Sequence, residues 1–183
     1  MKKIRESSDG AIMLEISIVL PMFILVVMYV YGLFVVNIAE NEITHALVQS
    51  TKSLSLDSYT NERYTSVLDG DEFWNGFSDM MTDVMRSFND QYYSSSTKWY
   101  DSQDVNTVKQ RFIGFFSGGD EGMANEKLIQ LGIKDGLSGL NFTVTSSKEE
   151  VTVKVSYTIQ IWFDAFGLGK IPMEHQITSK MWS

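Results

Sequence analysis

The chain contains no cysteine, which excludes disulfides, thiolate metal ligands and cysteine nucleophiles. Proline occurs only twice, so no segment is rich enough in it to form a stiff linker. Histidine also occurs only twice, at His45 and His175, with neither the spacing of a metal-ligand pair nor a nucleophile close in sequence. Both are interpreted as surface or packed residues, so the sequence offers few groups for catalysis or metal binding.

Basic residues are scarce beyond the first ten positions. The chain holds 15 Lys and Arg against 23 Asp and Glu, which gives a net charge of −8. Lys2, Lys3 and Arg5 lie in the polar segment 1–10, and the next basic residue is Lys52. Nucleic-acid binding needs clustered basic residues, so no nucleic-acid partner is expected.

A long apolar run follows the basic leader of residues 1–10. Residues 16–38 carry no charge and, as a helix, would cover roughly 34 Å, enough for a hydrocarbon core of about 30 Å. Pro21 and Gly32 inside the run are tolerated in membrane helices, and Pro21 predicts a kink. We therefore predict a transmembrane segment over residues 11–38.

The placement of basic residues predicts the topology of this segment. Lys and Arg are retained on the cytoplasmic side of a membrane, and three of them precede the run. The chain is therefore expected to lie in the cytoplasmic membrane as a single-pass protein. Its N-terminus would be cytoplasmic, and everything after Asn37 would be extracytoplasmic.

Helical periodicity continues beyond the apolar run. Apolar or small residues recur at helical spacing along one face, while Glu42, His45, Gln49 and Lys52 lie off that face. The helix is therefore expected to continue as an amphipathic segment to about residue 56 and to pack on its own domain. The residues of the buried face are Ile43, Ala46, Leu47, Ser50 and Leu54.

The remainder, residues 57–183, predicts an extracytoplasmic α+β domain. Residues 57–70 are polar and turn-like, and alternation of apolar and polar residues near the C-terminus predicts an antiparallel sheet of about three strands. Trp162 and Trp182 in this sheet are interpreted as core residues. The expected helices cover 71–92, 105–116 and 124–133, and the expected strands cover 140–146, 151–163 and 171–182.

Two carboxylate-rich motifs are interpreted as structural. Gly118-Gly119-Asp120-Glu121 copies four letters of the diguanylate-cyclase signature, but a glycine stands where that signature has Phe. A helix end followed by an acidic helix start explains the motif. The segment 69–72 lacks the spacing of a calcium loop. The sequence therefore predicts no cofactor, no metal site and no enzymatic activity.

Glu15 directly precedes the apolar run and lies five positions after Gly10. Insertion scales put the cost of a membrane-embedded charge at a few kcal/mol, so a function is expected for it. Two interpretations follow from the residues. Glu15 is a solvated, headgroup-level residue of a plain signal anchor, or it belongs to a prepilin-type export signal made of a basic leader, a small residue and a carboxylate.

The residues Gly10, Glu15 and Val19-Leu20-Pro21 resemble the N-terminus of the TadE-like family of tight-adherence pilus assembly pseudopilins. That family lies within the type IV pilin superfamily, whose members have a long N-terminal helix leading into a small sheet. The resemblance covers about residues 10–36. Ala11 departs from the aromatic residue usual at that position in type IV pilins.

The resemblance implies cleavage by a prepilin peptidase between Gly10 and Ala11. The new amino group at Ala11 would lie about one helical turn from Glu15. In a fibre, Glu15 could then pair with the N-terminus of a neighbouring subunit and set the axial register, because an unpaired buried charge is costly.

The implied function is that of a non-enzymatic minor pilin or pseudopilin in tight-adherence pilus assembly. Its partners would be the membrane, the prepilin peptidase and other pilins that contact its N-terminal helix. After processing it would join a surface fibre or the base of that fibre. The residues leave one alternative open, an uncleaved bitopic membrane protein with an extracytoplasmic binding or sensing domain, and cleavage after Gly10 separates the two.

Overall fold

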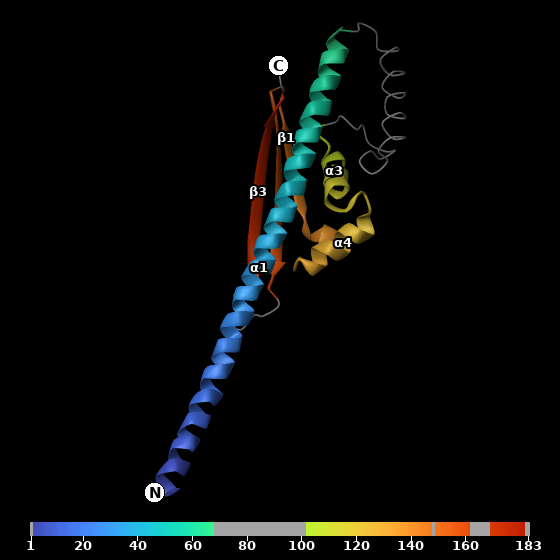
Figure 1. The fold of residues 1–183 in the computed structure, drawn as a ribbon. Coiled ribbons are helices and arrows are strands. Elements are labelled where there is room, and N and C mark those ends of the chain that lie inside the picture. Colours follow the sequence, from blue (N-terminus) through green and yellow to red (C-terminus); the bar gives the residue numbers. More distant parts are fainter. Residues whose placement is uncertain (1, 68–101, 148, 162–168, 182–183) are drawn as a thin grey trace.

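A single long helix organises the fold. The computed structural model describes residues 2–67, 102–147, 149–161 and 169–181, with side chains described from residue 13 and not over 61–67. Figure 1 shows α1 (Lys2–Val67) as a rod, with the other labelled elements gathered beside its upper part and its N-terminal part bare. The other elements are α3 (Val105–Ser117), α4 (Glu121–Gln130), the 3₁₀ helix η1 (Gly136–Gly139), β1 (Asn141–Ser146), β2 (Glu150–Gln160) and β3 (Lys170–Lys180).

Helix α1 is longer than the sequence predicts. It includes most of the leader and continues to Val67, so the expectation of a turn-like segment after residue 56 is wrong for residues 57–67. This segment is polar but holds no Gly or Pro, and the Thr60 hydroxyl donates to the carbonyl oxygen of Leu56 at 2.8 Å, within the helix. α1 also runs through Pro21 without a break in its helical assignment. Its 66 residues make a rod roughly 99 Å long.

Local capping explains where α3 and α4 begin. The carboxylate of Asp104 accepts from the backbone N–H of Asn106 at 3.0 Å, and the carboxylate of Asp120 accepts from that of Met123 at 2.9 Å. Gly118 ends α3 with φ 70°, a left-handed conformation that favours glycine. The interpretation of this glycine–acidic motif as a helix end followed by a helix start is confirmed.

The end of α4 differs from the prediction. The sequence predicts a helix from 124 to 133, but α4 begins at Glu121 and ends at Gln130. Gly132 follows with φ 89°, and its carbonyl oxygen accepts from the backbone N–H of Gln160 at 2.7 Å. The turn thus ties the end of α4 to the end of β2. Gly136 and Gly139 bound η1 and do not terminate α4.

The C-terminal strands form the predicted antiparallel sheet, in the order β1–β2–β3. Alternation along β2 is confirmed, with one set of side chains buried and the other facing outward. β2 ends at Gln160 and β3 at Lys180, so the expected strands are too long at Ile161 and Met181. The rest of the expected continuations, with Trp162 and Trp182, and most of the predicted turn at 166–169 lie outside the described residues. The buried β2 residues are Val151, Val153, Val155, Tyr157 and Ile159.

The core lies between this sheet and the pair of helices α1 and α3. β2 and β3 pack on α1, and β1 packs on α3, where the ring of Phe112 meets that of Phe142 edge to face at 5.3 Å. All five residues of the predicted buried face of α1 are buried. The expected α+β architecture is therefore confirmed for the described elements, while the helix expected over 71–92 lies outside them.

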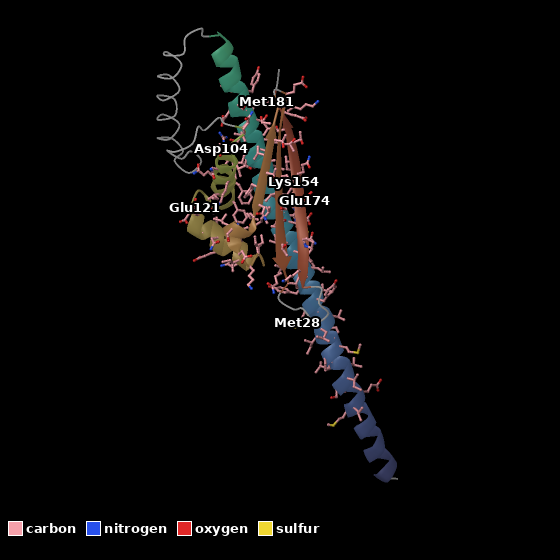
Figure 2. The ribbon with its side chains drawn as sticks, turned by 180° about the vertical axis from the view of Figure 1, so that it is seen from behind. Met28, Asp104, Glu121, Lys154, Glu174 and Met181 are labelled. Atoms are coloured by element: carbon pink, nitrogen blue, oxygen red, sulfur yellow. The ribbon has the colours of Figure 1, made fainter. Side chains whose placement is uncertain are left out.

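The opposite face of the sheet is polar. Lys154 Nζ lies 2.9 Å from a carboxylate oxygen of Glu174, and the hydroxyls of Thr152 and Thr178 lie 2.9 Å apart across the same strand pair. Figure 2 shows Lys154 and Glu174 on neighbouring strands, away from α1. These exposed pairs contribute little to stability, but they make this face suited to water.

Candidate membrane segment and assembly helix

Between Met13 and Tyr31, α1 exposes apolar side chains on every side. Met13 is 77% exposed and Phe34, more than five helical turns later, is 63% exposed. One helix among the described residues is long and apolar enough to cross a membrane, and only 6% of its most apolar 18-residue window is buried. A core helix of a soluble domain would be mostly buried, so this surface needs a bilayer or partner helices to cover it.

The candidate processing site lies on the same helix. The Gly10–Ala11 peptide falls within α1, and Ala11 and Glu15 are four residues apart, which places them one turn apart on one face. The Glu15 side chain is exposed. The predicted cleavage point and the predicted register residue therefore lie four residues apart along α1, while Pro21 lies further along the bare segment.

Gly32 is a point of close contact between α1 and the domain. Gly32 is buried, and a Cβ added to it would lie 2.7 Å from Cγ2 of Ile161, closer than real Cβ atoms approach a neighbour. Glycine at this position therefore lets the end of β2 approach the helix backbone. The sequence identifies Gly32 as a tolerated helix residue but does not predict this contact.

A groove of about 630 Å³ opens beside this contact, lined on one wall by α1 and on the other by α4, the Gly132 turn and β2. Figure 2 labels Met28, one of its lining residues, where α1 emerges from the domain. The α1 wall is apolar apart from the hydroxyl of Tyr31. The groove therefore joins the bare segment of α1 to the base of the domain.

A buried ion pair fixes the upper half of α1 to α3. Arg111 Nη1 lies 2.6 Å from a carboxylate oxygen of Asp57 and donates to the Ser53 hydroxyl at 2.5 Å. The Arg111 side chain is 1% exposed and that of Asp57 is 19% exposed, so the pair is largely removed from water. Because both partners come from distant segments, the pair specifies how α3 docks on α1.

A second cation links α1 to α4. Lys127 Nζ lies 2.6 Å from a carboxylate oxygen of Glu42 and 4.5 Å from the centroid of the Phe116 ring. Both charged side chains are partly exposed, so the pair is screened by solvent and adds less than the Arg111 pair. It orients α4 beside α1 just above the groove.

A part-buried polar pair lies where the sheet faces α1. The hydroxyl of Tyr157 and Nε2 of His175 lie 2.9 Å apart, on paired strands. Burial raises the pKa of the Tyr157 hydroxyl well above its ordinary value, and the nearby Glu40 carboxylate adds to the rise. Tyr157 therefore stays neutral at physiological pH and acts as a hydrogen-bonding core residue.

Potential metal-ligating side chains are not clustered among the residues that the structure describes. No group of three or more His, Cys, Asp or Glu side chains in that part of the chain could hold a metal ion. His45 is exposed on α1, far along the chain from the half-buried His175. The acidic segment 69–72 lies outside the described residues.

Comparison with known proteins gives no relative: no family model, no curated protein and no solved structure matches the chain. The resemblance over residues 10–36 therefore depends only on Gly10, Glu15 and Val19-Leu20-Pro21. Function has to be inferred from the residues and from the geometry of α1.

Sequence reasoning missed the residues that attach the domain to α1. Arg111 lies three residues after the apolar Val108 and directly before Phe112 on α3, and a cation beside these buried positions could have signalled a buried pair. Its partner Asp57 lies in a segment interpreted as a turn, so no helical pattern pointed to it. The groove depends on segments from three parts of the chain and has no local signature.

Proposed function

We propose that this chain is a membrane-anchored, non-enzymatic minor pilin or pseudopilin of the tight-adherence type. The observation that carries the proposal is the asymmetry of α1. From Met13 to Tyr31 it exposes apolar side chains all round, while from Ala39 to Ser58 it buries one face in its own domain. Such a helix suits a bilayer before assembly and a bundle of neighbouring helices after it.

The position of Glu15 supports the same proposal. A carboxylate on an otherwise apolar segment is costly in a bilayer or in a helix bundle unless a cation meets it. Cleavage after Gly10 creates such a cation at Ala11, on the same stripe of the helix. A neighbouring subunit shifted along the helix axis would then bring the new amino group to Glu15 and fix the register.

The orientation follows from the leader. Lys2, Lys3 and Arg5 keep the N-terminus in the cytoplasm, and the domain lies on the outer side. The membrane, a prepilin peptidase and other pilins are the partners of this scheme.

Processing gives the first test of the proposed function. In cells that contain a prepilin peptidase, the mature chain should begin at Ala11, and Gly10→Val should nearly abolish cleavage because a β-branched side chain crowds the scissile bond. Ser8→Val, a matched change two residues away, should leave cleavage intact. N-terminal sequencing of the assembled protein measures both, and an intact Met1 in wild type would favour the uncleaved bitopic alternative.

Topology gives a separate test. Gln176 is exposed on the outer face of β3, and the chain has no native cysteine, so Gln176→Cys introduces a single thiol. It should react with an impermeant maleimide on intact spheroplasts. Ser7→Cys, made together with Gly10→Val so that the leader stays attached, should react only after lysis. The reverse labelling pattern would contradict the orientation.

A further inference from the structure

The lower edge of the domain lies beside the apolar run of α1. Ile161, at the end of β2, contacts Gly32, and the α1 wall of the groove spans residues 27–36. This wall falls entirely within the charge-free run 16–38. The residues that line the other wall are called the domain base, and they lie at the level of a segment that the proposed function places in the bilayer. They are Ile129, Gln130, Gly132, Ile159, Gln160 and Ile161.

The side of α1 that faces away from the domain shows where the apolar surface ends. Phe34 and Ile38 lie on this side, two and six residues after the buried Gly32, and they are 63% and 51% exposed. The same stripe continues at helical spacing with Asn41 and His45, which are exposed and polar. The apolar surface on this side therefore ends between Ile38 and Asn41, above the level of the groove.

Two tyrosines lie just below the groove contact and indicate the same boundary. Tyr29 and Tyr31 are 44% and 69% exposed on α1. Tyrosine is enriched at membrane–water interfaces, where its ring contacts lipid and its hydroxyl contacts headgroups and water. Counted from Ile16, Tyr31 lies roughly 22 Å and Ile38 roughly 33 Å along the helix, so the outer surface of a hydrocarbon core about 30 Å thick falls between them.

The domain changes from apolar to polar at the same height as α1. Lys127, two residues before Ile129 on α4, pairs with Glu42, which lies above the apolar run. A second hollow, of about 610 Å³, adjoins this pair, and its α1 residues are Asn41, Glu42, Thr44 and His45. Below it, the six residues of the domain base carry no charge, and Ile129 is 49% exposed. One boundary between lipid and water can therefore cross both the helix and the domain.

We propose that the domain base is a membrane-contacting surface, which sits in the headgroup layer of the outer leaflet with Ile129 and the open side of the groove against lipid. The proposal rests on the membrane anchoring in the proposed function. Its partner is the lipid surface, because the exposed apolar side chains of α1 lie at the same depth as the groove. Contact of this kind strengthens with the apolar area that it removes from water. The chain would then meet the bilayer through two elements, with α1 across it and the domain base on its surface.

Depth-dependent quenching of single labels tests the proposal in the full chain, reconstituted in vesicles of phosphatidylcholine and phosphatidylglycerol. The chain has no native cysteine, so Ile129→Cys, Phe34→Cys and Gln176→Cys each carry one nitrobenzoxadiazole label. Phospholipids with a nitroxide near the top of the acyl chain should quench the labels at Ile129 and Phe34 to a similar extent. Gln176 lies six residues along β3 from Lys170, which pairs with Gln160 of the domain base, so its label is roughly 20 Å away and should be quenched about tenfold less.

A second label position guards against an effect of the substitution itself. Gln130→Cys, at the exposed neighbouring position, leaves Ile129 in place and should be quenched like the Ile129 label. If the Phe34 label is quenched while both labels of the domain base behave like that at Gln176, the inference is overturned and the membrane anchor stands. Efficient dimer formation by a bifunctional thiol cross-linker on Ile129→Cys would show a second copy at the groove, and would also overturn the inference.

Failure of the proposed function gives different results. A chain in which the Phe34 label also escapes quenching is not inserted, and this outcome overturns both the inference and the proposed function. Cleavage after Gly10 is measured separately by N-terminal sequencing. An intact Met1 on an assembled chain that shows the expected quenching overturns the pilin assignment alone.

Discussion

A Glu15→Ala chain should reach the membrane at wild-type abundance and yet fail to join a fibre. The buried core contacts the C-terminal half of α1, so the change leaves folding intact, and removal of a charge from the apolar run makes insertion slightly easier. In the fibre, the amino group of a neighbour would lose its counter-charge. At about 3 kcal/mol, this loss corresponds to roughly a hundredfold drop in assembly.

Cross-linking to other pilins and counts of surface fibres measure this effect, with immunoblots of membranes as the reference. Glu15→Gln keeps the shape of the side chain without its charge and should behave like Glu15→Ala. Ser17→Ala, a neighbouring neutral change, should assemble normally. Wild-type piliation by both Glu15 variants would show that Glu15 is a solvated headgroup-level residue, and the signal-anchor alternative would then be preferred.

The Asp57→Ala change should strongly destabilise the domain, although Asp57 is a polar residue at its edge. It removes the Asp57 carboxylate, which lies 2.6 Å from Nη1 of Arg111, from beside a guanidinium that is 1% exposed. Breaking a buried pair from one side costs on the order of 3 kcal/mol, which for a domain of this size lowers the melting temperature by about 10 °C. Thermal unfolding of the detergent-solubilised chain, followed by intrinsic fluorescence, measures the shift.

The reciprocal variant provides the control for this prediction. Arg111→Met replaces the buried cation by an apolar side chain of similar length and leaves Asp57, which is partly exposed and can be hydrated. Its melting temperature should fall much less, and the double variant should match Arg111→Met. Equal shifts for Asp57→Ala and Arg111→Met would indicate that packing, and not the charge pair, holds α3 on α1.

Much of the fold could be predicted because its signals are local. The alternation of Val151, Val153 and Val155 with polar residues predicts β2, and Gly118 predicts the end of α3. Each depends on a period or a backbone conformation within a few residues. The continuation of α1 to Val67 could not be predicted in this way, because polar residues there are held by distant contacts. Ser58, for example, is buried and bonds to Ser102 at 3.3 Å.

The candidate site was likewise predictable from local sequence features and not from long-range contacts. The apolar run, Glu15 and Gly10 are sequence features, and the structure places them on one helix with an exposed apolar surface. The groove could not be predicted, because it forms where Gly32 meets Ile161, 129 positions later in the chain. The ion pair of Arg111 could not be predicted either, because its partner Asp57 lies 54 positions earlier in the chain. Contacts of this range depend on the tertiary arrangement of α1, α3 and the sheet.

The attachment of the domain along one side of α1 has a mechanical consequence. In a fibre held together through the bare half of α1, a pulling force would run from helix to helix along their axes. The three strands lie beside α1 and would not carry this force, so tension would not separate β1, β2 and β3. Separating the domain from α1 would require shearing the whole face from Gly32 to Ser58, where apolar contacts and the Arg111 pair act in parallel. A chain without disulfides could thus resist load without covalent cross-links.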